Sequence, residues 1–300
     1  MLPYPPTPTV DQTDDHHGTL VADPYRWLED TESPQTRQWI EAQNALTFGV
    51  LETLPGRAEI RARLTELWNY PKRYAPLRRG GRYFQLRNSG LQNQDVLYVL
   101  DALDDDPTAR PLLDPNGLAE DGTLALNTWE PSRDGRWLAY AVSGSGSDWQ
   151  TWRVRAVATG ADLPDTLEWS KFSGAAWLPD GSGFLYCRYD VPPPGATYLG
   201  ANYHQKLYLH RLNSPQSDDL LIYQRPDEKE WGFGAKISDD GEYLVLHVWS
   251  GTDTRNRLFY RPLHAETPFV ELISELEANY EFVGNDGPVF YLQTNWQAAR

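Results

Sequence analysis

The sequence is poor in cysteine and in long apolar runs, and each shortage excludes a class of protein. Cys187 is the only cysteine among 300 residues, so an internal disulfide and a cysteine-rich metal site are both excluded. No stretch approaches the roughly 20 apolar residues of a membrane-spanning helix, and residues 1–10, MLPYPPTPTV, lack the basic and apolar regions of a secretory signal. We therefore expect a cytoplasmic protein with no membrane partner, in which the thiol stays reduced.

Positive charge is also scarce. The chain has 27 Lys and Arg residues against 42 Asp and Glu residues, which gives a formal net charge of −15. An acidic surface repels phosphate backbones, so nucleic-acid binding would need a local basic patch. The two candidates, residues 78–82 (RRGGR) and Arg61 with Arg63, are short and lie beside acidic residues, which favours a solvated surface. We expect no nucleic-acid partner.

Aromatic and turn-forming residues are abundant. The chain contains 12 Trp, 17 Tyr, 23 Gly and 23 Pro residues, a composition that favours many turns over long helices. Leu, Val and aromatic residues stand in short runs that are separated by Asp-Gly, Asn and Pro. This arrangement is typical of a β protein.

The first 72 residues differ from the rest of the chain. Residues 1–32 are rich in proline and acid and predict an extended strap that lies over another surface. Ser33 and Pro34 then predict the start of a helix, and Pro55-Gly56 predicts its end. A second helix, which Pro71 terminates, is predicted from apolar residues at helical spacing: Ile60, Leu64, Leu67 and Trp68. Two short helices bury little surface, so we expect them to need a partner body.

A repeat begins near residue 73, where the apolar pattern changes to a period of two. Four segments start with an Asp-Gly turn that leads into an aromatic or aliphatic strand. A similar segment, the first along the chain, has Gly80-Gly81 in place of Asp-Gly. These turns recur at intervals of roughly 50 residues. The first four units each contain a further strand, at residues 96–101, 151–157, 206–212 and 257–263.

Repeats of this length with several strands per unit are typical of β-propeller blades. A β-sandwich is the alternative fold, but it explains only the short strands and not the recurring turn. The fifth unit stops after residues 291–295, before its later strands, and an open ring of blades would leave unpaired strand edges that favour aggregation. We expect a mainly β fold: an incomplete β-propeller of about five blades, the last partial, at residues 73–300, preceded by the short helical segment at residues 1–72.

No pattern in the sequence indicates a catalytic centre. The Gly-x-Ser-x-Gly turn of serine hydrolases does not occur, and residues 143–149 (SGSGSDW), the nearest match, predict a propeller loop. The six histidines include no His-Glu-x-x-His pair, and His16-His17 beside two aspartates predicts a solvated turn. A phosphate-binding glycine-rich loop is also missing. We therefore assign no catalytic residue, no metal ligand and no cofactor to this chain.

Several unusual short segments of the sequence resemble those of the prolyl oligopeptidases, and they are distributed over nearly the whole chain. They are residues 23–30 (DPYRWLED), 41–44 (EAQN), 90–94 (GLQNQ), 97–99 (LYV), 113–116 (LDPN), 144–149 (GSGSDW) and 204–208 (HQKLY).

The resemblance implies a seven-bladed propeller that caps an α/β-hydrolase domain, in a serine endopeptidase that cleaves short peptides after proline. Residues 1–72 would then pack on the hydrolase domain, and residues 73–300 would match roughly the first five blades. The Ser-Asp-His triad of the family has no counterpart here, so we expect an N-terminal fragment without activity of its own. Its partners would be proline-containing oligopeptides in the complete enzyme and a complementary hydrolase chain. The alternative is a free-standing propeller that binds peptides or proteins.

The same resemblance points to few propeller residues in the substrate pocket. Phe172, in the context Lys171-Phe172-Ser173, matches an aromatic residue of the family's pocket, although a place in the core is equally compatible with the sequence. Thr252 stands where the family has a cysteine, so we expect no thiol sensitivity at that position. We assign Trp231 and Phe233 to packing.

Overall fold

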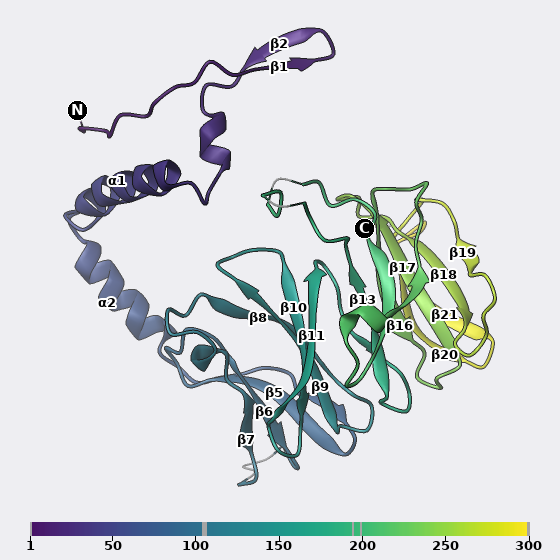
Figure 1. The fold of residues 1–300 in the computed structure, drawn as a ribbon. Coiled ribbons are helices and arrows are strands. Elements are labelled where there is room, and N and C mark those ends of the chain that lie inside the picture. The colour runs from purple at the N-terminus through teal and green to yellow at the C-terminus, as the bar shows by residue number, and fades with distance from the viewer. Residues whose placement is uncertain (1, 104–106, 194, 199, 299–300) are drawn as a thin grey trace. The chain divides into compact units, whose positions relative to one another are not determined.

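A computed structural model describes residues 2–103, 107–193, 195–198 and 200–298 (Figure 1). The chain divides into two compact units, which are residues 1–69 with 192–201, and residues 70–191 with 202–300. Each unit is described by itself below. In the described ranges, neither unit contains a helix that is long and apolar enough to span a membrane.

The first unit begins with a hairpin rather than with a wholly extended strap. Strand β1 (Thr13–His16) pairs antiparallel with β2 (Thr19–Ala22), and a 3-10 helix, η1 (Arg26–Glu29), follows. The turn is formed by His17 and Gly18, whose φ angles of 57° and 88° lie in the left-handed region. Two left-handed residues match the twist of a two-residue hairpin, so the chain folds back at this point.

Two helices follow where the sequence predicts them. Helix α1 (Pro34–Leu51) is capped by Ser33, whose side chain accepts a 3.1 Å hydrogen bond from the backbone N–H of Thr36. Helix α2 (Arg57–Trp68) begins after Gly56. The apolar row of α2 is exposed, with 62% of the surface of Ile60 accessible to solvent and about half of Leu64.

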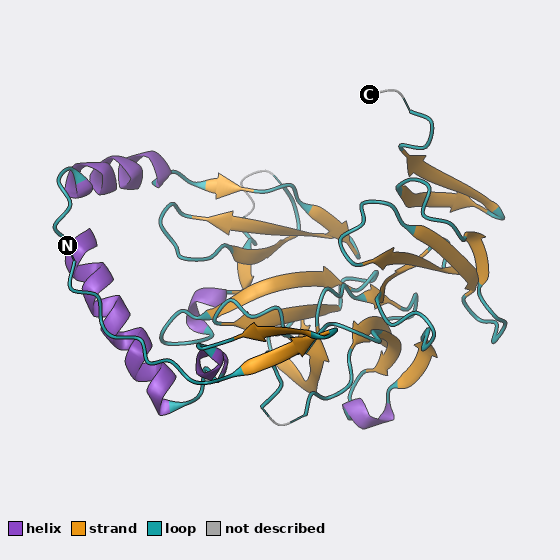
Figure 2. Ribbon diagram, turned by 90° about the horizontal axis from the view of Figure 1, so that it is seen from above, coloured by secondary structure: helices purple, strands orange, loops and turns teal. Residues whose placement is uncertain are grey.

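In the part of the second unit that the structure describes, the strands form five antiparallel sheets (Figure 2). The first contains β3 (Lys72–Arg73), β4 (Leu77–Arg79), β5 (Arg82–Asn88), β6 (Val96–Leu100) and β7 (Arg110–Leu113). The second contains β8 (Leu124–Pro131), β9 (Trp137–Gly144), β10 (Gln150–Ala156) and β11 (Asp162–Ser170). The third contains β12 (Ala176–Trp177), β13 (Gly183–Arg188), β14 (Lys206–Arg211) and β15 (Leu220–Tyr223). The fourth contains β16 (Trp231–Ile237), β17 (Tyr243–Ser250), β18 (Arg257–Pro262) and β19 (Val270–Ile273), and the fifth β20 (Tyr280–Asp286) and β21 (Val289–Thr294).

Strand order identifies each sheet as one propeller blade. Strands that follow one another in the chain are neighbours in the second, third and fourth sheets, so each of these is a four-stranded meander. In the first sheet, β3 and β4 both pair with β5, each along a different part of the same edge. A sandwich would gather the strands into two sheets, so that alternative is wrong. The predicted incomplete propeller, with about five blades of which the last is partial, is confirmed for the described residues.

The Asp-Gly turns join the first strand of a blade to its second, so each blade begins one strand earlier than the repeat unit that the sequence indicates. Gly135, between β8 and β9, has a φ angle of 69°, and a Cβ atom at this position would lie 2.9 Å from the carbonyl oxygen of Arg79. Because glycine has no Cβ atom, it can adopt the left-handed conformation and also lets the neighbouring blade approach closely. The turns therefore also set how closely successive blades pack.

Hydrophobic cores lie between neighbouring blades. Phe84 and Leu97 of the first blade pack with Tyr140 of the second, and Trp152 of the second packs with Phe184 of the third. Burial of each such side chain contributes about 1.5–3 kcal/mol. Because a blade buries its face only against the next blade, the stability of the second unit depends on contacts between neighbours.

Candidate functional site

One end of the blades carries the residues that the resemblance selects. Neighbouring strands of a blade run in opposite directions. The turn from the second to the third strand therefore lies at the same end of the blade as the connection from the last strand to the next blade. In the second, third and fourth blades these connections are residues 145–149, 171–175, 189–191, 202–205, 224–230, 251–256 and 274–279. We call this end the connection face. The Asp-Gly turns lie at the other end.

Phe172 lies on the connection face, between β11 and β12, and 49% of its surface is exposed. It therefore does not belong to the core, and the core alternative is wrong. Its φ angle of 54° is in the left-handed region. For a residue other than glycine this conformation costs about 1–3 kcal/mol and persists only where the surroundings enforce it. An exposed aromatic ring in an enforced conformation is a candidate for binding.

Hydrogen bonds hold the backbone on both sides of Phe172. The carbonyl oxygen of Lys171 accepts a 2.9 Å bond from Nε2 of Gln205, and the N–H of Ser173 donates a 3.3 Å bond to Oε1 of Gln150. The hydroxyl of Ser173 accepts a 2.8 Å bond from the N–H of Cys187. These contacts come from the second and third blades, so Phe172 is fixed where two blades meet.

Aromatic rings surround the loop that carries Phe172. Trp149 packs edge to face with Trp169 at 5.5 Å between ring centroids and with Tyr189 at 6.2 Å. Nζ of Lys171 lies 4.0 Å from the centroid of Trp149 and donates a 2.9 Å bond to Oδ1 of Asn202. Burial lowers the pKa of Lys171 and raises the pKa of Tyr189 to about 12. The loop thus offers an apolar ring and other aromatic edges to a ligand, whereas the cation of Lys171 is buried and holds the loop through Trp149 and Asn202.

Thr252 lies on the connection face, in the turn that follows β17, and is exposed. The next residue, Asp253, forms a 2.6 Å ion pair with Arg255, whose hydrogen bonds lower the pKa of Asp253 to about 2. The absence of thiol sensitivity here stays a prediction. Trp231 and Phe233 are buried in the core between the third and fourth blades, so their assignment to packing is confirmed.

Cys187 is not suited to nucleophilic chemistry. The residue is buried on β13, and its Sγ donates a 3.0 Å hydrogen bond to the carbonyl oxygen of Phe233. Burial raises the pKa of the thiol, which keeps it protonated at neutral pH. Cys187 therefore acts as a small core residue.

The serine-rich segment that follows β9 forms a tight turn and not a nucleophile elbow. Ser145 and Gly146 have φ angles of 52° and 75°, and strand β10 follows them. A nucleophile elbow requires a helix after the serine. The predicted propeller loop is confirmed.

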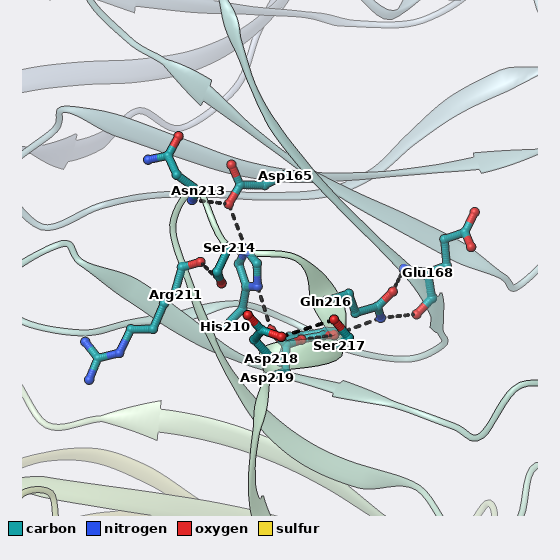
Figure 3. Close-up of polar contacts among 11 residues, drawn as sticks. Asp165, Glu168, His210, Arg211, Asn213, Ser214, Gln216, Ser217, Asp218 and Asp219 are labelled. Carbon is teal, nitrogen blue, oxygen red and sulfur yellow. Dashed lines mark hydrogen bonds and ion pairs between the residues drawn. The ribbon is translucent and has the colours of Figure 1, made fainter.

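The structure also contains a buried charged cluster that the sequence patterns do not reveal (Figure 3). Nε2 of His210, on β14, lies 2.8 Å from Oδ1 of Asp165 on β11, and its Nδ1 lies 2.7 Å from Oδ1 of Asp219. All three side chains are fully buried. Burial lowers the pKa of His210, but the hydrogen bonds to the two carboxylates outweigh it and raise the pKa to about 9. At neutral pH the ring is therefore an imidazolium that donates from both nitrogens.

The surroundings of His210 indicate a structural role. The hydroxyl of Tyr186 donates a 2.6 Å bond to Oδ2 of Asp219, and the N–H of Asn213 donates a 2.7 Å bond to Oδ1 of Asp165. Neither ring nitrogen is left to act as a general base. Because Asp165 belongs to the second blade and His210 to the third, the cluster ties two blades together. In the described ranges, no group of His, Cys, Asp and Glu side chains is suited to hold a metal ion.

Comparison with known proteins assigns the chain to a family. Residues 5–300 match the family model described as the N-terminal β-propeller domain of prolyl oligopeptidase. The chain belongs to the prolyl oligopeptidase family. This agrees with the resemblance in the sequence and with the blades of the second unit.

Individual prolyl oligopeptidases are similar over nearly the whole chain. The prolyl endopeptidase of Elizabethkingia meningoseptica is 36% identical over 298 residues, which cover 99% of this chain and 42% of the relative. Prolyl oligopeptidase A of Galerina marginata is 33% identical, with 98% and 44% covered. The solved structure of Galerina marginata prolyl oligopeptidase B with a 25mer macrocyclization substrate has a TM-score of 0.83 at 30% identity, with 99% and 45% covered. The chain thus spans less than half the length of these relatives.

Proposed function

We propose that this chain is the propeller-bearing portion of a cytoplasmic, serine-type prolyl endopeptidase that cleaves short peptides after proline. In this role the propeller admits oligopeptides and excludes folded proteins. The observation that carries the proposal is the match of residues 5–300 to the propeller domain of the family. In the complete enzyme, a histidine-activated serine outside these residues would perform the acyl transfer.

The part of the reaction proposed for this chain is binding. The exposed ring of Phe172 would form one wall of the peptide site, where a proline ring or another apolar side chain can pack against it. The edges of Trp149 and Trp169 extend the apolar surface, and the cation of Lys171 lies next to it. Such a surface orients a peptide without taking part in bond cleavage.

Residues 1–72 are proposed to pack on the hydrolase domain. The exposed apolar row of α2, which includes Ile60, Leu64 and Leu67, supports this proposal, because such a row normally faces a partner. The partner could be supplied by the same polypeptide in a longer protein or by a complementary chain. Mixing this chain with the missing hydrolase portion would then restore hydrolysis.

The proposed function is tested by an assay of the purified 300-residue chain with a chromogenic Gly-Pro substrate. We expect no turnover by the chain alone and turnover after addition of the hydrolase portion of a relative. Turnover by the chain alone that a serine-directed inhibitor blocks would overturn the proposal.

A further inference from the structure

Two buried glutamines, Gln150 and Gln205, hold the loop on either side of Phe172. Gln150 is the first residue of β10 and is 4% exposed. Gln205 directly precedes β14 and is 1% exposed. A buried amide must form hydrogen bonds with both of its ends, because an unsatisfied buried polar group destabilises the fold.

Gln205 connects the loop of Phe172 with the fourth blade. Its Nε2 donates to the carbonyl oxygen of Lys171 at 2.9 Å, and its Oε1 accepts from the N–H of Phe233 at 2.6 Å. Phe233 lies on β16 and is buried in the core between the third and fourth blades. One side chain therefore fixes the residue before Phe172 relative to a rigid strand.

Gln150 holds the other side of the same loop. Its Oε1 accepts from the N–H of Ser173 at 3.3 Å, and its Nε2 donates to Oδ1 of Asn127 on β8. The two glutamines thus hold the carbonyl before Phe172 and the N–H after it. These are peptide groups whose orientation decides whether Phe172 keeps its positive φ angle of 54°.

We infer that Gln205 and Gln150 are positioning residues, which hold Phe172 in its left-handed conformation and so aim its ring at the peptide. The role of Phe172 in peptide binding rests on the proposed function, whereas the control of its conformation by the two glutamines does not. Without the hydrogen bond from Gln205, the loop relaxes to an ordinary φ angle, and the ring turns away from its present direction.

Gln205 provides the test variant, and a buried glutamine outside the loop of Phe172 provides its control. Gln205→Met removes both hydrogen bonds of the amide, including the bond that holds the carbonyl of Lys171, without burying a charge. Gln85, on β5 of the first blade, is 9% exposed, and its Nε2 likewise donates a 2.8 Å bond to a backbone carbonyl, that of Tyr74. Gln85→Met is thus the matched control, with the same substitution and the same kind of lost bond.

The first measurement reports the position of the ring without any peptide. With fluorophenylalanine at position 172, we expect Gln205→Met to move and broaden its ¹⁹F resonance and Gln85→Met to leave it near the wild-type shift. Gln150→Met, which removes the bond on the other side of the loop, should also move the resonance. An unchanged resonance in a folded Gln205→Met variant would overturn the inference. If this variant does not fold, Gln205→Glu replaces it at a pH high enough to ionise the buried carboxyl, because a carboxylate cannot donate to the carbonyl of Lys171.

The second measurement is the affinity of the 300-residue chain for a proline-containing peptide, determined by calorimetry. Gln205→Met and Phe172→Ala should weaken binding by the same factor, the double variant should weaken it no further, and Gln85→Met should stay within twofold of wild type. Additive losses would contradict a role that acts through Phe172. A moved ¹⁹F resonance together with an unaffected Phe172→Ala affinity would support the positioning role and refute the proposed peptide contact.

Discussion

The buried imidazolium of His210 makes the stability of the second unit dependent on pH in the alkaline range. The folded-state pKa of about 9 lies above the ordinary value of 6.5 because Asp165 and Asp219 both accept hydrogen bonds from the ring. A group whose pKa is raised on folding stabilises the folded state fully below its unfolded pKa. That contribution is lost as the pH rises through the folded pKa.

The magnitude follows from the difference between the two values. A gap of roughly 2.5 pKa units at about 1.36 kcal/mol per unit gives about 3 kcal/mol, present at pH 6 and lost by about pH 9.5. His247 contributes in the opposite sense, because burial lowers its pKa and its contribution is lost as the pH falls below 6.5. A comparison of the wild type with a His210 variant at each pH removes the His247 contribution, which both proteins share.

The assay is urea unfolding of the wild type and of His210→Gln between pH 6 and pH 9.5. Glutamine keeps a hydrogen-bonding side chain but removes the charge, so the wild type should exceed the variant in free energy of unfolding by about 3 kcal/mol more at pH 6 than at pH 9.5. If the two free energies fall in parallel across this range, the buried imidazolium does not exist and the reasoning is refuted.

Three further predictions concern individual side chains. Cys187 should not react with a thiol reagent in the native chain but should react fully in urea, because it is buried and protonated; rapid native labelling would contradict the assignment. Arg133 donates to the backbone carbonyls of Ser238 and Asp239 in the fourth blade at 2.6 and 2.8 Å, so Arg133→Met should lower the free energy of unfolding by about 1.5–3 kcal/mol in urea titration. Leu64→Gln, on the exposed row of α2, should change stability by less than about 0.5 kcal/mol in the same titration, and a larger loss would show that Leu64 is buried.

Features that depend on a few neighbouring residues could be predicted from the sequence. The cap of Ser33 on α1 is a local hydrogen bond, and each Asp-Gly turn combines a positive φ angle with flanking apolar strands. Their regular recurrence defined the blades. The hairpin of β1 and β2 was missed because β1 is charged, both strands are short and mostly exposed, and neither shows an alternation between apolar and polar residues.

Features that depend on contacts between blades could not be predicted. Asp165 and His210 are 45 residues apart, and their pairing requires the second blade to pack on the third. The hydrogen bonds from Gln150 and Gln205 to the loop of Phe172 likewise join residues that are 23 and 34 positions apart in the sequence. The sequence was equally compatible with Phe172 in the core and with Phe172 in the pocket, because local context does not determine which side of a loop faces solvent.

The most direct test of the account is photo-crosslinking of the 300-residue chain with a proline-containing peptide that carries a benzophenone, followed by mapping of the labelled residues. We predict labelling of the connection face, at residues 145–149, 171–175, 202–205 and 251–256, and loss of labelling in Phe172→Ala. Labelling confined to the Asp-Gly turns at the opposite end of the blades, or labelling that Phe172→Ala leaves unchanged, would contradict the claim that this face binds the peptide.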